Sequence, residues 1–260
     1  MDWQQAAKVF GPNFISPQTF IDCLQAEFSE EEMKALENIP LSESDAGSFD
    51  LYNRHKDTIV HVKDSYLLCP MPARLQMHGR SAPLNVYNLV KFFGFSQNPN
   101  KKIFFINNEK VDGWDTWFRN ASGSKSHPVY QTGSASWFLI RKDAVPASLE
   151  KSLNVGRGLL SANDALPTLL EVLTAMFGYY FSIIDPQKTD EAVKMPRYFS
   201  RDWYARMLSG KMTYTQDLFS SGFVLIAGLN TPASGIYLEK LEAQKPSYVT
   251  GICPVRRLKN

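Results

Sequence analysis

The sequence predicts an α+β protein in which N-terminal helices are followed by a mixed, mainly antiparallel sheet. Apolar residues recur at helical spacing in residues 1–40, and short apolar runs separated by turn residues follow them. A capped apolar helix then precedes three further apolar runs near the end of the chain. Of the 260 residues, 44% are hydrophobic, so the chain can bury a large core in one domain or two.

Two helices are predicted at the start of the chain. Residues 3–10 carry apolar side chains at helical spacing, and Gly11-Pro12 then ends the pattern. Ser16 has the side chain of an N-cap, and Pro17 suits the first position of a helix. A second helix therefore begins at Pro17.

Two further helix starts carry the pattern of a capping box. In this pattern a Ser or Thr and a Glu three residues later each satisfy a free backbone N–H of the other. Ser29 and Glu32 fit the pattern in the N-terminal section. Thr168 and Glu171 fit it at the start of the apolar segment 169–181, which predicts a buried helix.

Several short apolar runs predict strands, because each is bounded by turn residues or proline. Pro70 is expected to end the second of them, and we expect the last three to form consecutive antiparallel strands. Residues 86–95 fit a short helix or an extended segment equally well. The predicted strands are residues 58–62, 65–69, 103–106, 137–140, 222–227, 235–238 and 248–255.

Residues 120–136 are dense in Ser, Gly, Thr and Pro, which is typical of a loop or an internal boundary. We therefore expect an N-terminal helical section at 1–40, an α+β body at 41–130 and a C-terminal α+β region at 131–260. The last two regions can also form one continuous domain.

Charge and cysteine content favour a cytoplasmic protein that does not bind nucleic acid. The chain has 28 basic and 26 acidic residues, so no strong field marks a polyanion partner. Cys23, Cys69 and Cys253 cannot all pair, which fits a reducing compartment. No signal-peptide pattern begins the chain, and no apolar run approaches the roughly 20 residues that span a bilayer.

The basic doublets of the sequence are scattered, and solvated surface is their simplest interpretation. A protein or carbohydrate partner remains open, and the sequence does not indicate an oligomeric state. The doublets are Lys101-Lys102, Arg141-Lys142 and Arg256-Arg257.

Imidazole and thiol groups gather in one part of the sequence, at His55, His61, Cys69 and His78. Zinc accepts such ligands, but their spacing matches no standard site, so ordinary core or surface residues are favoured and no metal or cofactor is expected. His61, Cys69 and His78 are nevertheless the first candidates for a catalytic site that assembles only in three dimensions.

The aromatic residues Trp114, Trp117 and Phe118 lie close together beside a Ser/Gly-rich segment. Aromatic rings in such a place can form a ligand or partner surface. Packing in a core is the competing interpretation, and it is the more common one for large apolar side chains.

The second half of the chain resembles the C-type-lectin-like fold, as found in formylglycine-generating-enzyme-like domains and related bacterial modules. Leu166-Pro167-Thr168 with Glu171 is similar to the L-P-T-x-x-E element of these domains. Residues 251–256 are similar to their terminal G-x-R-x-V-R strand, with Cys253 in place of the arginine. Uncharacterised bacterial proteins share similar stretches at residues 66–72 and 137–148.

The resemblance implies a scaffold that presents loops for binding more often than one that performs catalysis. Formylglycine-type enzymes use paired cysteines in the C-terminal region, where this chain has only Cys253. The Glu-Pro-Asn and Gln-Pro-Asp tripeptides of calcium-dependent sugar sites are absent.

These observations favour a non-enzymatic binding or assembly protein of unknown ligand. One alternative is an enzyme whose site converges only in the folded chain. A second alternative is a structural component of a larger particle.

Overall fold

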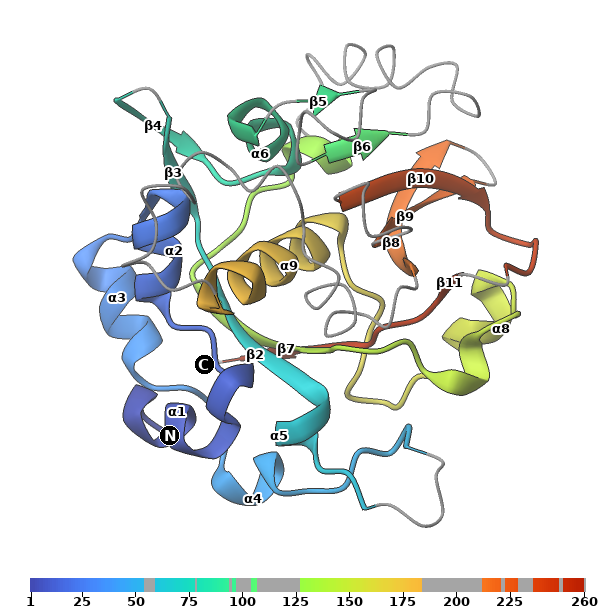
Figure 1. The fold of residues 1–260 in the computed structure, drawn as a ribbon, viewed down its shortest axis with the longest axis horizontal. Coiled ribbons are helices and arrows are strands. Elements are labelled where there is room, and N and C mark those ends of the chain that lie inside the picture. Colours follow the sequence, from blue (N-terminus) through green and yellow to red (C-terminus); the bar gives the residue numbers. More distant parts are fainter. Residues whose placement is uncertain are drawn as a thin grey trace.

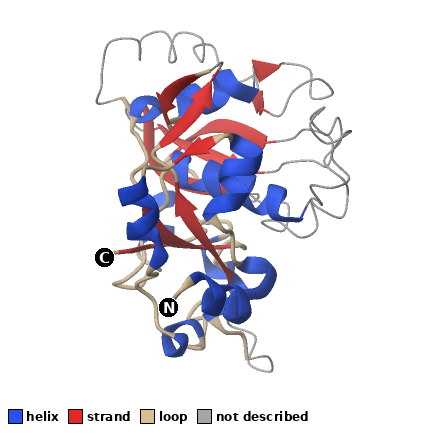
Figure 2. Cartoon of the chain, turned by 90° about the vertical axis from the view of Figure 1, so that its left-hand side faces the viewer, coloured by secondary structure: helices blue, strands red, loops and turns tan. Residues whose placement is uncertain are grey.

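The computed structural model describes residues 1–53, 59–77, 79–93, 95–96, 104–106, 127–183, 212–220, 223–228, 236–247 and 250–259. Within these ranges the protein is α+β, with helices first and mainly antiparallel strand pairs after them, as the sequence predicts (Figure 1). The two ends of the chain lie on the same side of the molecule (Figure 2).

After an N-terminal section that is mainly helical, groups of described strands are separated by helices, and the last five described elements are strands. The helices are α1 (Trp3–Phe10), η1 (Gly11–Asn13), α2 (Pro17–Leu24), α3 (Glu30–Glu37), α4 (Glu43–Ala46), α5 (Val62–Ser65), α6 (Val86–Phe93), η3 (Pro128–Tyr130), η4 (Pro146–Ser148), α8 (Leu153–Arg157) and α9 (Leu169–Ile183). The strands are β1 (Ala26–Glu27), β2 (Tyr66–Met71), β3 (Arg74–Met77), β4 (Arg80–Pro83), β5 (Phe95–Ser96), β6 (Phe104–Ile106), β7 (Ser136–Arg141), β8 (Met212–Ser220), β9 (Phe223–Gly228), β10 (Ile236–Glu242), β11 (Thr250–Gly251) and β12 (Val255–Leu258).

The predicted helix starts are confirmed by their caps. The Ser16 hydroxyl accepts a hydrogen bond from the Thr19 N–H, and Pro17 opens α2. Ser29 and Glu32 form the predicted capping box of α3. Each cap satisfies backbone N–H groups that the first turn of a helix leaves without an intrahelical partner.

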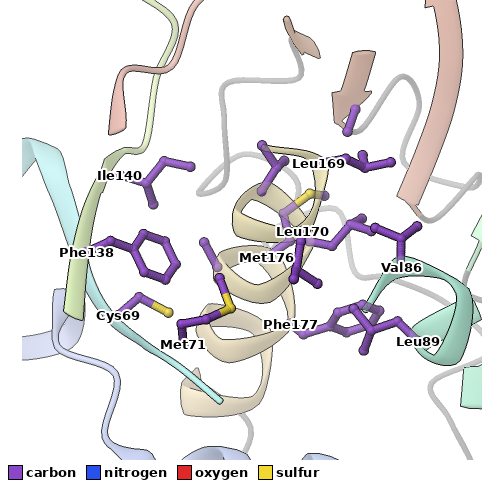
Figure 3. Close-up of a cluster of buried hydrophobic side chains, with 14 of the residues drawn as sticks. Cys69, Met71, Val86, Leu89, Phe138, Ile140, Leu169, Leu170, Met176 and Phe177 are labelled. Atoms are coloured by element: carbon purple, nitrogen blue, oxygen red, sulfur yellow. The ribbon is translucent and has the colours of Figure 1, made fainter. Parts of the chain in front are cut away.

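The strands β12, β7 and β2 form the central sheet, with β7 in the middle and antiparallel to both neighbours. This pairing joins residues 66–71 to the C-terminal half, so the predicted regions 41–130 and 131–260 share one sheet. Alternating side chains of β7 enter two different cores. Phe138 and Ile140 point toward α9 (Figure 3), whereas Trp137 and Leu139 pack with the N-terminal helices.

Helix α9 is buried along most of its length and contacts the central sheet, α2 and the strands β8 and β9. It approaches α2 closely because Gly178 has no side chain. A Cβ at this position would lie 2.5 Å from Cζ of Phe20 and 3.0 Å from Cγ2 of Ile15. Glycine inside a helix costs about 1 kcal/mol relative to alanine, and the close contact with α2 explains why it is present.

A second sheet contains β11, β8, β9, β10, β6 and β5 in that order, and a small third sheet contains β1, β3 and β4. Strand β10 is antiparallel to β9 and parallel to β6. The predicted strands at 103–106, 137–140, 222–227 and 235–238 correspond to β6, β7, β9 and β10. The ambiguous segment 86–95 is mainly the helix α6, with β5 beginning at Phe95.

Two strand predictions in the first half need correction. His61 makes only an isolated bridge to Phe49, and Val62 starts the short helix α5, so residues 59–62 form no strand. Pro70 does not end the next run, because β2 continues to Met71. Strand β2 is at the edge of the central sheet, where a residue without an N–H is tolerated.

The prediction of three consecutive antiparallel strands at the end of the chain is partly wrong. Strands β9 and β10 pair antiparallel, but β11 pairs parallel with β8. The chain then leaves this sheet, and β12 pairs antiparallel with β7. Residues 252–254 make the crossing, with the Val145 N–H donating to the Ile252 carbonyl and the Arg141 N–H to the Pro254 carbonyl.

Candidate functional site

The histidine and cysteine candidates are not brought together in the described part of the chain. Cys69 is fully buried against α9 (Figure 3), its Sγ donates to the Pro70 carbonyl at 3.6 Å, and burial raises the pKa of its thiol. His61 Nδ1 lies 2.6 Å from the Gly47 carbonyl oxygen, and its ring stacks on Phe49.

The other predicted site residues lie outside the described ranges. These are His55, His78, Trp114, Trp117 and Phe118. Within the described ranges no group of three or more His, Cys, Asp or Glu side chains could hold a metal ion. No helix in those ranges is long and apolar enough to cross a membrane.

A pocket of about 600 Å³ lies where β7 begins and β12 ends, next to the start of α9. Its walls combine apolar side chains with hydroxyl, amide and charged groups. The lining residues are Met71, Pro128, Gln131, Thr132, Gly133, Ser134, Ala135, Ser136, Trp137, Phe138, Thr168, Leu170, Glu171, Asp217, Arg257, Leu258 and Lys259.

The start of α9 is fixed at this pocket by the predicted capping box. The Thr168 hydroxyl accepts from the Glu171 N–H at 3.0 Å, and the Glu171 Oε2 accepts from the Thr168 N–H at 2.6 Å. Strand β8 adds two bonds, because the Gln216 N–H donates to the Pro167 carbonyl and Asp217 Oδ2 accepts from the Leu169 N–H at 2.5 Å. Two hydrogen bonds thus cap this helix end, and two more hold it against β8.

Glu171 and Arg257 form a two-pronged ion pair at the pocket wall. Arg257 Nε donates to Glu171 Oε1 at 2.7 Å, and Nη2 donates to Oε2 at 2.8 Å. The register of β12 sets Arg257 opposite Phe138, on the sheet face that packs against α9. Both Glu171 oxygens are therefore occupied by donors of the protein itself.

The basic doublets are only partly the solvated surface that the sequence suggested, because Arg257 is exposed whereas Arg256 is partly buried and Arg141 is buried. Arg256 points to the opposite face from Arg257, and its Nε donates to the Asp164 carboxylate at 3.0 Å. Arg141 is 7% exposed and pairs with Asp50 at 3.1 Å. Lys101-Lys102 lies outside the described ranges. Each of these described arginines compensates a carboxylate that is buried in the fold.

Asp217 is the buried ionisable group of the pocket that is least compensated. The residue is 5% exposed. Within the described residues, no group donates a hydrogen bond to its Oδ1. Burial raises its pKa to about 6, and the nearby Glu171 charge acts in the same direction. The Leu169 N–H and the Arg257 charge lower the pKa, but the cost of desolvation is larger.

We expect Asp217→Asn to stabilise the protein above pH 6 and to change little near pH 4. The folded state holds a proton on Asp217 up to about pH 6, whereas the unfolded chain releases it near the ordinary aspartate pKa of 3.8. As the pH rises from the unfolded pKa to the folded pKa, the free energy of unfolding therefore falls. Above the folded pKa this loss of stability is complete. An amide keeps the acceptor for Leu169 and avoids a buried charge, for a gain of about 1–3 kcal/mol at pH 8. Urea unfolding of both proteins at the two pH values measures the difference, and an equal effect at both would contradict the assignment.

The sequence indicated Glu171 as a helix cap and as part of the L-P-T-x-x-E element, but it did not single out Asp217 or Arg257 as site residues. The only available signal was the pair of arginines, Arg256-Arg257, directly after the apolar run near the end of the chain. The chain matches no known family model, and neither a curated protein nor a solved structure is significantly similar to it. The pocket must therefore be interpreted from its own geometry.

Proposed function

We propose that this chain is a non-enzymatic binding protein and that its ligand occupies the pocket beside the start of α9. One observation carries the proposal: a nearly buried carboxyl group, Asp217, lines a cavity and keeps one oxygen without a donor in the described structure. A buried polar atom without a partner is costly, so a ligand that supplies a donor gains the bond. The volume of about 600 Å³ suits a small molecule.

The composition of the lining supports binding over nucleophilic catalysis. The described residues of the pocket wall include no cysteine or histidine. Cys69 and Cys253 are buried in the core, and burial raises the pKa of both thiols. A thiol nucleophile needs a depressed pKa and a neighbouring base, and these thiols have the opposite environment.

The enzymatic alternative is favoured by one observation, the pKa of about 6 at Asp217. General acids and bases work best when their pKa lies near the operating pH. In this alternative Asp217 would exchange a proton with a bound substrate, and Glu171 and Arg257 would position the start of α9. Turnover of a bound compound, detected as a product, distinguishes the alternative from simple binding.

We also propose that the C-terminal half is a C-type-lectin-like scaffold. Support comes from the meeting of its two motifs, since Glu171 of the first pairs with Arg257, the residue that directly follows the second. Gly251 of the second motif lies where no side chain fits, because a Cβ added to it would lie 2.7 Å from the Ala144 Cβ. A protein or carbohydrate partner at Trp114, Trp117 and Phe118 remains a separate prediction.

Filling the pocket tests the proposed function. We expect Ser134→Trp to abolish the binding of compounds that shift the melting temperature of the wild-type protein in a small-molecule screen. Ser134 is exposed at the pocket wall, so the indole can occupy the cavity without disturbing a core. The matched control is Gln4→Trp on the exposed face of α1. If Ser134→Trp binds every such compound as well as the control does, the ligand site is elsewhere.

A further inference from the structure

We propose that the ligand of this pocket carries a protonated amine and that the amine binds the Asp217 carboxylate. The inference rests on the proposed function, because it names the chemical class of the ligand at the same site. Two carboxylates, Glu171 and Asp217, line the pocket wall, and in the described structure only Glu171 has an ion-pair partner.

The Glu171 carboxylate is not available to a ligand. Its Oε1 accepts from Arg257 Nε, and its Oε2 accepts from both Arg257 Nη2 and the Thr168 N–H. A ligand that displaced Arg257 would break a two-pronged ion pair, and one that displaced the Thr168 N–H would break the cap of α9. Such charge-assisted bonds are about twice as strong as neutral ones, so displacement is unfavourable.

Asp217 has a different set of partners. Its Oδ2 accepts one hydrogen bond, from the Leu169 N–H, and no cation of the described chain forms an ion pair with it. The charged groups that surround it come from two packed elements and the end of the chain. They are Glu171 on α9, Arg257 on β12 and Lys259 beyond β12 at the pocket wall.

Arg257 is committed to Glu171, and Lys259 is exposed to solvent, so the deep carboxylate has no counter-charge of its own in the described structure. A buried charge is stable only when it is paired and hydrogen-bonded. A ligand ammonium supplies both the opposite charge and N–H donors for Oδ1. A hydroxyl supplies only the donor, so it binds more weakly.

The rest of the wall describes the body of the ligand. Met71, Leu170 and Leu258 contribute apolar surface to the same pocket. An apolar substituent on the amine therefore gains contact area, whereas the ammonium ion alone does not. Benzylammonium combines the two features, and benzyl alcohol is a neutral compound of nearly the same shape.

Binding of the amine must depend on pH through Asp217. The free carboxyl group ionises at about pH 6, whereas benzylammonium stays protonated from pH 5 to pH 7.5. The affinity is expected to be roughly tenfold weaker near pH 5 than near pH 7.5, since most of the carboxyl is protonated at the lower pH. The other carboxylate of the wall, Glu171, is already paired with Arg257.

The experiment titrates the full chain with benzylammonium and with benzyl alcohol by NMR, at about pH 5 and about pH 7.5 and at constant ionic strength. Support requires tighter binding of the amine, the roughly tenfold loss near pH 5, and a roughly tenfold to hundredfold loss in Asp217→Asn. Asp143→Asn, which removes an exposed carboxyl away from the pocket, is the matched control and keeps the wild-type affinity.

Two outcomes overturn the inference and separate it from the proposed function. If the alcohol binds as tightly as the amine, without pH dependence, the ligand class is wrong but the pocket still binds small molecules. If neither probe binds and Ser134→Trp also changes no interaction found by screening, the pocket itself is not the site. Should Asp217→Asn fail to fold, the pH dependence of the wild-type protein still decides between the two probes.

Discussion

Trp137→Ala lowers the free energy of unfolding by about 3–5 kcal/mol, which is the usual cost of removing a large buried aromatic side chain. Trp137 is 1% exposed and lies on β7, the middle strand of the central sheet. Its ring stacks on Phe14 at 5.8 Å and packs in the core shared with the N-terminal helices. The substitution therefore leaves a cavity at the junction between these helices and the sheet.

A hydrogen bond adds to this packing. The Leu36 carbonyl belongs to the last turn of α3, where carbonyls lack intrahelical partners. It accepts from the indole N–H groups of both Trp137, at 2.9 Å, and Trp3, at 2.6 Å. Trp137→Phe should cost less than Trp137→Ala, because most of the ring volume remains and Trp3 still satisfies the carbonyl. Urea unfolding measures both variants, and a loss below about 1 kcal/mol for Trp137→Ala would show that this junction is unimportant.

The helix starts could be predicted from the sequence because capping is a local interaction. Ser29 and Thr168 each bond to a glutamate three residues later, so the whole determinant lies within one turn. The strand at residues 137–140 was also recognisable, since its side chains are buried on both faces of the sheet and form a continuous apolar run.

Strand β8 could not be recognised in the same way. Thr213, Thr215 and Asp217 are buried, so polar residues occupy positions where the alternating pattern of a strand requires apolar ones. Their polar groups are satisfied by distant partners, as when the Thr215 hydroxyl donates to the Leu225 carbonyl and the Thr213 hydroxyl accepts from the Cys253 N–H. These partners become known only once the strands are paired.

The pocket escaped prediction for a related reason. Glu171 and Arg257 are 86 residues apart in sequence and meet because β12 joins the central sheet in one particular register. Asp217 reaches the start of α9 from the other sheet, and it lies within an irregularity in the pairing of β8 with β9. No short motif contains these three residues, so a search for catalytic or binding motifs could not find them.

Arg141→Met is expected to lower the free energy of unfolding by about 3–5 kcal/mol, because it leaves a buried charge without its partner. The Asp50 side chain is 0% exposed and Arg141 is 9% exposed at its side chain, so water screens neither group well. Arg141 Nε donates to Asp50 at 3.1 Å, and Nη1 donates to the carbonyls of Asp143 and Ala144. The arginine thus ties the segment around Asp50 to the end of β7.

The double variant Arg141→Met, Asp50→Asn separates the buried charge from the lost packing and carbonyl contacts. Removing both charges abolishes the uncompensated carboxylate, and the asparagine oxygen can still accept from the Tyr52 N–H, as Asp50 does at 3.1 Å. The double variant should therefore be more stable than Arg141→Met alone, although it should still be less stable than the wild-type protein. A double variant that is less stable than either single variant would mean that Asp50 stabilises the fold mainly through contacts other than Arg141, and the ion pair would then not be what fixes this segment to the sheet.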